Sequence, residues 1–306
     1  MHEPSYCFYR RITRPHILLL AFLCFFDALI SGFFLFHNDI GWHLATGDLI
    51  LSSHSIPMTD PWSYTANGAP WYNLAWLWDV LASLLYKYTG GMGLVLLTLG
   101  IGASSIFLLA VTAMRMGAHP PTSILLASLV AIALPFYAPP DIFLCAAPQQ
   151  MTLFFSALLI LLLWRFQMDR NRSAFVTLPL LFVLWCNMHG GFIVGVTIMG
   201  AMIGAALLKG GITLCKQLIT ILALSCAATF LLNPYGIHLI QAVTIVLGDN
   251  FRPHITEWQP LYSVPSPIFL VSGLLYSIFF LIALVPWLLI ACPLSQKMRE
   301  ASCRDG

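Results

Sequence analysis

The stretch MGLVLLTLGIGASSIFLLAVTAM, residues 92–114, decides the fold class because it contains no charged side chain. A helix rises 1.5 Å per residue, so this stretch is about 35 Å long and can cross a bilayer core of about 30 Å. Comparable apolar runs occupy residues 17–36 and 267–290. The sequence therefore predicts an all-α polytopic membrane protein.

The composition excludes an ordinary soluble globular enzyme. Of the 306 residues, 59% are hydrophobic and 8% are charged, against about 25% charged in a typical soluble domain. The 14 basic and 12 acidic residues form no block of like charge, so we expect no nucleic-acid-binding arm and no acidic tail. The eight cysteines include no CxxC pair, which favours core residues over a disulfide framework or a metal site.

About eight transmembrane helices are expected, and they lie at residues 17–36, 92–114, 120–138, 150–166, 174–188, 192–208, 217–232 and 267–290. The first run follows three arginines but is too long for a cleaved signal peptide and lacks a small-residue cleavage site, so we expect a retained span. No linker or internal repeat divides the chain. Residues 1–306 are therefore predicted to form a single integral membrane domain.

The segment 73–88 is the main ambiguity in the topology because it is apolar yet contains Asp79 and Lys87. If it lies at the membrane interface, twelve of the fourteen basic residues fall on the side of the N-terminus. If it spans the membrane, the division is nine against five. The positive-inside rule favours the first arrangement, with the N-terminus (1–16) and the tail (291–306) both in the cytoplasm.

The first extracytoplasmic loop is then expected at residues 37–91. Its first half has many aromatic residues and no Lys or Arg. Apolar and polar residues mix after Asp39, which predicts a short helix on the membrane surface. The segment 73–88 would be a second interfacial, juxtamembrane helix.

The motif His37-Asn38-Asp39-Ile40-Gly41-Trp42-His43 carries the strongest local signal for chemistry. Asp39 and His43 are four residues apart, so both lie on one face of a helix. A carboxylate there can act as a general base or ligate a divalent cation, while the imidazole contacts a phosphate. The structural alternative is that Asn38 or Asp39 only caps the interfacial helix, and the two roles can coexist.

The run Asn187-Met188-His189-Gly190-Gly191-Phe192 predicts a turn below the outer membrane surface. Only about 15 residues precede it in its span, and they rise about 22 Å at helical pitch. Irregular backbone at that depth is tolerated where it is buried in protein or lines a wet cavity. His189 would face such a cavity, or alternatively be satisfied by neighbouring carbonyl groups.

Four further features carry two interpretations each. Thr59-Asp60-Pro61 is typical of a turn or helix start with Asp60 as the cap. Asp141 is either a second metal ligand or a solvated loop acid. Asn233-Pro234-Tyr235-Gly236 is a helix-breaking turn with polar groups that can serve a site. Arg252 is either the partner of an anionic ligand or part of a loop salt bridge.

The ordered set of motifs resembles bacterial polytopic proteins of the GT-C glycosyltransferase superfamily, in the branch related to protein O-mannosyltransferases and lipid A aminoarabinose or galacturonic acid transferases. The resemblance extends from about residue 15 to residue 290. It rests on Asp39-x-x-Trp42-His43, Ile56–Thr65, Trp76-Leu77, Asn187–Phe192, Asn233–Gly236 and Glu257-Trp258.

The resemblance implies a multi-pass protein of the bacterial inner (cytoplasmic) membrane. Its implied activity is the inverting transfer of a sugar from a polyprenyl-phosphate donor to an extracytoplasmic acceptor, which is a lipid, a glycan or a protein. Asp39 would be the base or a metal ligand, and Asp141 would be the second acid that holds Mg²⁺ or Mn²⁺. The contacts to sugar and phosphate would come from His43, Asn187, His189, Arg252 and Glu257.

Two departures from the family pattern support a different class of function. Relatives often carry an Arg-Pro pair before the fifth span, whereas this chain has Ala146-Ala147-Pro148-Gln149-Gln150. Many relatives also continue into further spans or an outer domain. The alternative is a non-catalytic membrane protein, namely a degenerate transferase, an assembly partner or a lipid or glycolipid transporter; the absence of two related halves argues against transport.

Overall fold

The computed structural model describes residues 39–116, 118, 123, 146–169 and 172–247. All of them belong to the first of two units into which the chain divides, Met1–Asp249 and Asn250–Gly306. The helices of this part are α2 (Ile40–Ser53), α3 (Trp76–Thr89), α4 (Gly91–Arg115), α7 (Gln149–Asp169), α8 (Ala174–Met188), α9 (Phe192–Leu208), α10 (Ile212–Leu232), the 3₁₀ helix η1 (Gly236–His238) and α11 (Leu239–Leu247).

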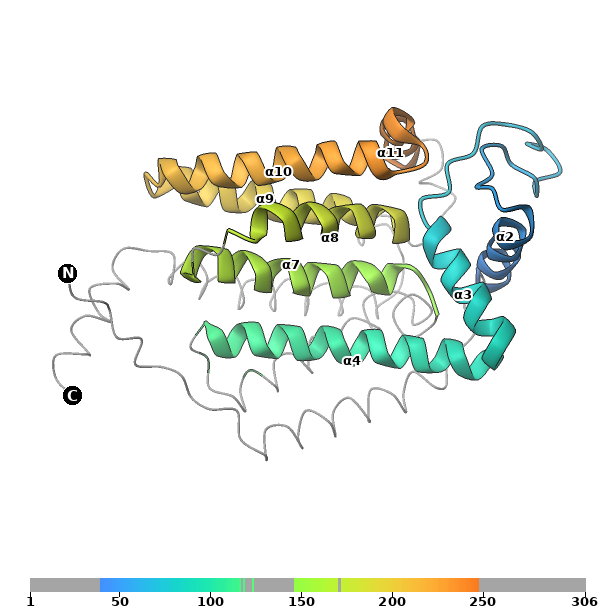
Figure 1. Cartoon of the computed structure of the whole chain (residues 1–306), viewed down its shortest axis with the longest axis horizontal. Helices are drawn as coiled ribbons and strands as arrows, with labels where there is room; N and C mark the ends of the chain where they lie inside the picture. Colours follow the sequence, from blue (N-terminus) through green and yellow to red (C-terminus); the bar gives the residue numbers. More distant parts are fainter. Residues whose placement is uncertain (1–38, 117, 119–122, 124–145, 170–171, 248–306) are drawn as a thin grey trace, which may run out of the picture. The chain divides into compact units, whose positions relative to one another are not determined.

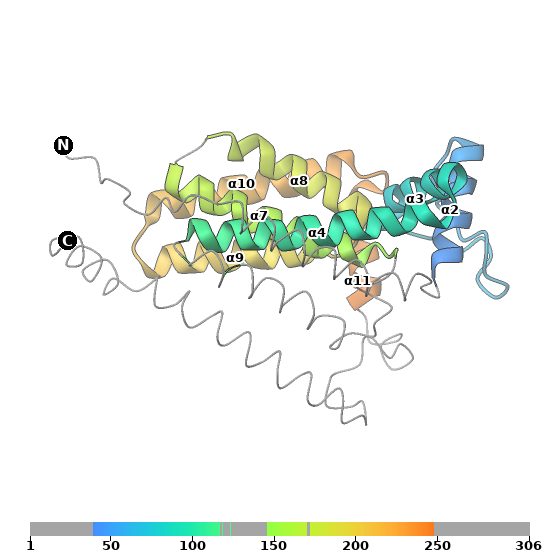
Figure 2. The same cartoon turned by 90° about the horizontal axis from the view of Figure 1, so that it is seen from below.

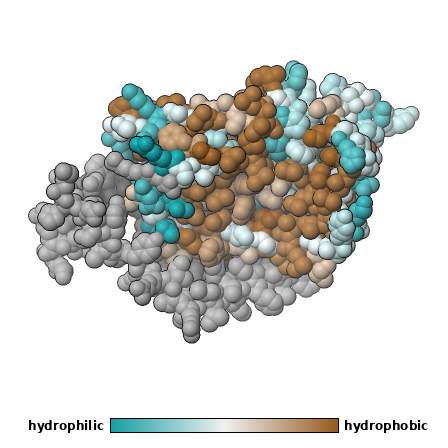
Figure 3. All heavy atoms as spheres, viewed as in Figure 1, coloured by the Kyte–Doolittle hydropathy of each residue, from teal (hydrophilic) through white to brown (hydrophobic). Residues whose placement is uncertain are grey.

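Five helices, α4 and α7 to α10, lie side by side with their axes roughly aligned (Figures 1 and 2). Among the described residues, α4, α7 and α10 are long and apolar enough to cross a membrane. Apolar side chains cover the middle of the face in Figure 3, and hydrophilic ones gather towards its two ends. These features are those of a helical membrane protein. The count of eight spans stays a prediction, because the expected spans at 17–36, 120–138 and 267–290 lie almost wholly outside the described residues.

The helices α8 and α9 have the bounds expected from the sequence, 174–188 and 192–208. With 15 residues, α8 is about 22 Å long, whereas the 25 residues of α4 extend about 37 Å. Because α8 is shorter than α4, its C-terminal end is followed in space by another element of the chain, α3, which packs against it. The predicted short helix therefore ends beneath another element of the same chain.

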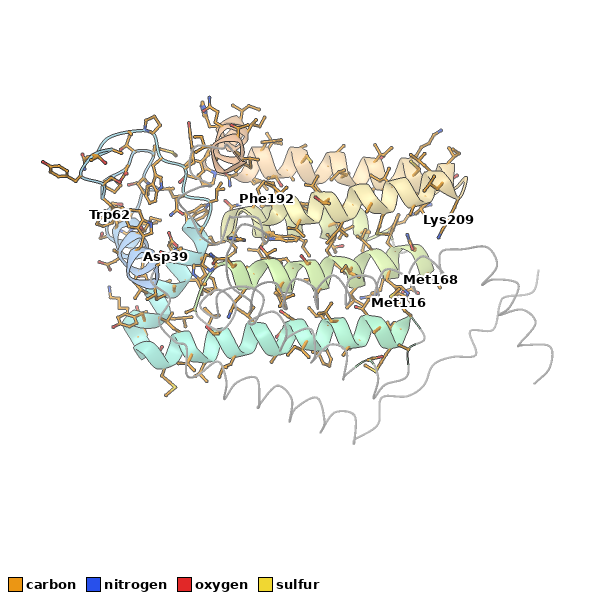
Figure 4. All side chains as sticks on the ribbon, turned by 180° about the vertical axis from the view of Figure 1, so that it is seen from behind. Asp39, Trp62, Met116, Met168, Phe192 and Lys209 are labelled. Carbon is orange, nitrogen blue, oxygen red and sulfur yellow. The ribbon has the colours of Figure 1, made fainter. Side chains whose placement is uncertain are left out.

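The connections between the aligned helices lie at two opposite ends of the bundle. Figure 4 shows Asp39, Trp62 and Phe192 at one end and Met116, Met168 and Lys209 at the other. We call the first of these the α2–α3 end. Outside α2 and α3, the described lysine and arginine residues lie at or next to the opposite end, where α4, α7 and α9 end and α8 and α10 begin. They are Arg115, Arg165, Arg172, Lys209 and Lys216.

The first loop contains two helices, as expected, namely α2 and α3, which pack closely on each other; their position at the membrane interface stays a prediction. Gly47 makes this approach possible, because a Cβ there would collide with the carbonyl oxygen of Asp79 and lie 2.6 Å from the Cβ of Ser83. Gly90 separates α3 from α4 with a positive φ of 62°, a conformation that glycine adopts without steric cost. The segment 73–88 is thus a helix of its own and not part of α4.

The main apolar core lies between α3, α4 and the helices α7 to α10. Trp78 of α3 and Trp185 of α8 are completely buried in it. Trp185 contacts the rings of Phe155 and Phe182 at centroid distances of 5.6 and 6.1 Å. Burial of such large rings contributes strongly to packing, so the α2–α3 end is attached to a well-packed helix bundle.

Candidate functional site at the α2–α3 end

A histidine from α2 and a carboxylate from α3 form the centre of the site. His43 Nδ1 lies 2.6 Å from Asp79 Oδ1. The second carboxylate oxygen of Asp79 accepts a hydrogen bond from Asn73 Nδ2 at 2.6 Å. Because Asn73 Oδ1 accepts from the backbone N–H of Ala75 at 3.0 Å, the orientation of that amide is determined. Asp79 is 1% exposed, so its carboxyl group is satisfied by protein groups alone.

His189 lies in the turn between α8 and α9, and its ring is held from the Nδ1 side. Nδ1 accepts from the backbone N–H of Gly191 at 3.1 Å and lies 2.6 Å from Thr152 Oγ1. The hydroxyl of Thr152 in turn accepts from Trp185 Nε1 at 3.3 Å. A Cβ at Gly191 would collide with Thr152 Oγ1, so only glycine leaves room for this arrangement.

The protonation of His189 is shifted towards the neutral ring. Burial, and to a lesser extent the charge of His43, lower its pKa to about 4. Burial disfavours the charged form of an imidazole because the low-dielectric surroundings replace water. At neutral pH His189 is therefore an uncharged hydrogen-bonding group.

Asn187 ties three elements together beneath this turn. Its Oδ1 accepts from Trp76 Nε1 at 2.7 Å and from Asn233 Nδ2 at 3.2 Å. Its Nδ2 donates to the carbonyl of Val183 at 2.7 Å. These hydrogen bonds join α8 to the start of α3 and to the end of α10, so Asn187 is engaged by protein groups, and its role as a ligand contact stays a prediction.

The turn after α10 supplies a tyrosine to the same polar cluster. Tyr235 Oη accepts from the backbone N–H of Asn73 at 2.9 Å. Burial raises the pKa of Tyr235 to about 12, so the phenol is protonated at neutral pH. The helix-breaking turn Asn233–Gly236 therefore contributes to the surroundings of Asp79. Its sequence pattern predicted mainly a turn, with polar groups that can serve a site.

Asp39 precedes α2 and lies at the same end as this cluster (Figure 4). Its side chain is exposed and makes no capping hydrogen bond to α2, so the interpretation of Asp39 as the capping side chain is wrong. The reason is its backbone, which has φ −87° and ψ −6°, whereas a capping residue usually has extended dihedrals that aim its side chain at the first amides. Asp39 remains one helical turn before His43, as its spacing predicted.

Asp60 has the structural role that its sequence context predicted. Its Oδ1 accepts from the backbone N–H groups of Trp62 and Ser63 at 2.8 and 3.0 Å. Hydrogen bonds from Ser63 and then from Trp62 lower the pKa of Asp60. The segment is a turn and not a helix start, because Pro61 is not helical; the bridge between Thr59 and Pro70 closes the loop instead.

Asp141, Arg252 and Glu257 lie outside the described residues. Within the described ranges, no group of three or more His, Cys, Asp or Glu side chains is arranged to hold a metal ion. The role of a divalent cation, and the roles of these three residues, therefore stay predictions.

Three residues of the site were not identified as candidates from the sequence: Asn73, Asp79 and Thr152. Asp79 carried a usable signal, because an acid in an apolar helix that packs inward must be paired. Thr152 had no comparable signal, since threonine is common inside apolar helices. Its role depends on the approach of α7 to the α8–α9 turn.

Comparison of the chain with known proteins found no relative. Neither a family model, nor a curated protein, nor a solved structure matches the chain.

Proposed function

We propose that the chain is a membrane glycosyltransferase, which moves a sugar from a polyprenyl-phosphate donor to an extracytoplasmic acceptor with inversion at the anomeric carbon. One observation carries the proposal. The end of an apolar helix bundle holds a carboxylate, Asp39, one helical turn from His43, whose ring is oriented by the buried Asp79. The α8–α9 turn, which carries His189, is contacted by the start of α3, where Trp76 donates to Asn187 and Leu74 lies against Gly190.

The proposed reaction needs a proton acceptor and groups that bind the leaving phosphate. The hydroxyl oxygen of the acceptor attacks the anomeric carbon from the face opposite the phosphate. The bond between that carbon and the phosphate oxygen breaks, its electron pair leaves with the polyprenyl phosphate, and the hydroxyl proton passes to the Asp39 carboxylate. A carboxylate suits this role because its oxygens can accept a proton, and Asp39 is exposed directly before α2.

Exposed apolar side chains on the flanks of the bundle support a lipid-linked donor. Leu96 on α4, Val176 and Leu180 on α8, and Leu231 on α10 are more than half exposed, as expected for side chains that face acyl or prenyl chains. The polar cluster lies at the end of the same helices. A ligand with an isoprenoid tail and a polar head therefore matches both surfaces, and Arg252 is the cation that we assign to its phosphate.

The first test measures lipid binding by the full chain in nanodiscs. Polyprenyl phosphate should bind saturably, and polyprenol of the same length should bind at least about tenfold more weakly, or about 1.4 kcal/mol. Arg252→Ala should remove most of this difference. Addition of Mg²⁺ or Mn²⁺ shows whether a cation contributes. Failure of polyprenyl phosphate to bind would contradict the proposal and favour the non-catalytic alternative.

The second test measures transfer. Release of polyprenyl phosphate from a labelled polyprenyl-phosphate sugar is followed after addition of a cell-envelope extract as the source of acceptors. Asp39→Asn should abolish release while lipid binding persists, whereas Asp48→Asn, which changes an exposed acid on the same helix, should release lipid at the wild-type rate. Retained turnover in Asp39→Asn would contradict the assignment of the base.

A further inference from the structure

The ring of His43 is anchored so that Nδ1 is its donor. Oδ1 of Asp79 lies 2.6 Å from His43 Nδ1, and Oδ2 accepts a hydrogen bond from Asn73 Nδ2 at 2.6 Å. A carboxylate has no hydrogen to donate, so the hydrogen in the His43–Asp79 bond belongs to Nδ1. In the neutral ring, Nε2 of His43 is then a hydrogen-bond acceptor.

The ring of His189 is anchored in the opposite sense. Its Nδ1 faces the backbone N–H of Gly191 at 3.1 Å, which can only donate. The hydroxyl of Thr152 lies 2.6 Å from the same nitrogen. The hydroxyl oxygen accepts from Trp185 Nε1, and its own hydrogen can be donated to Nδ1 of His189. Nδ1 of His189 therefore carries no hydrogen, and Nε2 of the neutral ring is a donor.

The start of α3 contacts both segments that carry the two rings. Asp79, which holds His43, belongs to this helix, and Trp76, one turn earlier, donates to Asn187 at the end of α8. Leu74 lies over the α8–α9 turn, where a Cβ added to Gly190 would be 2.9 Å from its Cδ1. His43 and the turn that carries His189 thus both contact the start of α3, and their imidazoles have opposite hydrogen-bonding polarity.

We propose that His43 and His189 together bind a hydroxyl group of the transferred sugar, rather than the lipid phosphate. The ligand hydroxyl donates to His43 Nε2, and its oxygen accepts from His189 Nε2–H. This assignment rests on the proposed function and specifies which part of the donor occupies this pair. No proton is transferred, because the two rings only orient the hydroxyl.

The phosphate diester of the donor does not match the pair. A phosphate diester carries oxygen acceptors and no hydrogen to donate at neutral pH, so it needs a donor on each ring. The lone pair of His43 Nε2 would face its anionic oxygen. A sugar hydroxyl is both donor and acceptor, and a site built to hydrogen-bond such a group on both sides discriminates strongly against a ligand that lacks it.

The first experiment determines the two tautomers by ¹⁵N NMR of the full chain, labelled at its nine histidines and embedded in nanodiscs at pH 7. His43→Gln and His189→Gln assign the signals by their disappearance. The expected result is Nδ1–H for His43 and Nε2–H for His189. The same tautomer at both residues, or a doubly protonated His43, would overturn the inference. Thr152→Ser should keep the His189 tautomer, and Thr152→Val should add the Nδ1–H form.

The second experiment compares the affinities of polyprenyl phosphate mannose and polyprenyl phosphate. The wild type should prefer the sugar-bearing lipid, and His43→Phe and His189→Phe should each reduce this preference about tenfold, or about 1.4 kcal/mol. His189→Gln, which keeps an N–H donor, should restore part of it. Equal loss of both lipids, or an unchanged preference, would overturn this inference and leave the proposed function standing. Binding of neither lipid would overturn both.

Discussion

Asp79 shows how a single buried carboxylate organises this end of the molecule. It lies in an otherwise apolar helix, is 1% exposed, and makes hydrogen bonds to His43 and Asn73. Removal of one partner from a buried polar pair leaves the other partner unsatisfied, which costs more than the hydrogen bond itself contributes. Asp79 therefore acts on the proposed chemistry indirectly, through the orientation of the His43 ring.

Asp79→Ala is expected to lower the free energy of unfolding of the embedded chain by about 2–3 kcal/mol, because it leaves His43 Nδ1 and Asn73 Nδ2 without an acceptor. Denaturant unfolding in mixed micelles, followed by circular dichroism, measures this change. Asp48→Ala is the matched control, since it removes an exposed acid from α2 and should change the value by less than about 0.5 kcal/mol. Equal effects of the two substitutions would contradict a structural role for the Asp79 carboxylate.

Asp60 acts within a single loop. Its folded-state pKa lies below the ordinary value of 3.8, so its ionised form stabilises the turn at pH values above 3.8. That contribution is lost as the pH falls through the lowered pKa. Hydrogen exchange at the amides of Trp62 and Ser63 should speed up in Asp60→Ala at pH 7, and protection in the wild type, corrected for the intrinsic rates, should decline below about pH 4. Unchanged protection in Asp60→Ala would show that the bridge between Thr59 and Pro70 alone holds the loop.

At the scale of elements, the site depends on how closely α2 approaches α3. The sequence predicts each helix, but their separation is decided by Gly47, whose missing side chain admits the backbone of Asp79 and the Cβ of Ser83. His43 precedes Gly47 by one helical turn on the same face. The hydrogen bond between His43 and Asp79 therefore depends on a contact between two other residues.

Gly47→Ala is expected to separate the two helices and destabilise the chain by about 1–3 kcal/mol, as overpacking does. Gly41→Ala is the matched control on the same helix, because nothing lies within 4 Å of its added Cβ; it should be neutral or stabilise by about 0.5–1 kcal/mol. Unfolding midpoints measure both changes, and the ¹⁵N signal of His43 should shift in Gly47→Ala only. A silent Gly47→Ala would contradict close packing of α2 on α3.

At the scale of the whole molecule, α7 to α10 alternate in direction, α4 runs the same way as α7, and the polar residues of the described helices gather at two ends. Basic side chains gather where α4, α7 and α9 finish, and the histidines of the candidate site gather at the α2–α3 end. The positive-inside rule assigns the basic end to the cytoplasm. The proposed chemistry would then take place on the outer side of the membrane.

Thiol labelling of intact cells tests this orientation. In a background without the native cysteines, Asn67→Cys should react with a membrane-impermeant maleimide, because residue 67 is exposed in the loop at the α2–α3 end. Thr213→Cys, exposed in the first turn of α10, should react only after the cells are opened. Labelling of Thr213→Cys in intact cells, with protection of Asn67→Cys, would show the inverted topology.

The sequence by itself determined the class of this protein and the bounds of α8 and α9, because apolar stretches of bilayer-spanning character form helices, which satisfy their own backbone hydrogen bonds, and polar turns with glycine interrupt them. It also placed His43 and His189 among the candidates. Only the tertiary structure decided that Asp79 holds His43, across 36 residues of sequence, and that Thr152 holds His189. Such pairs depend on packing between distant segments, and nothing in a residue's local pattern reports which distant partner will satisfy it.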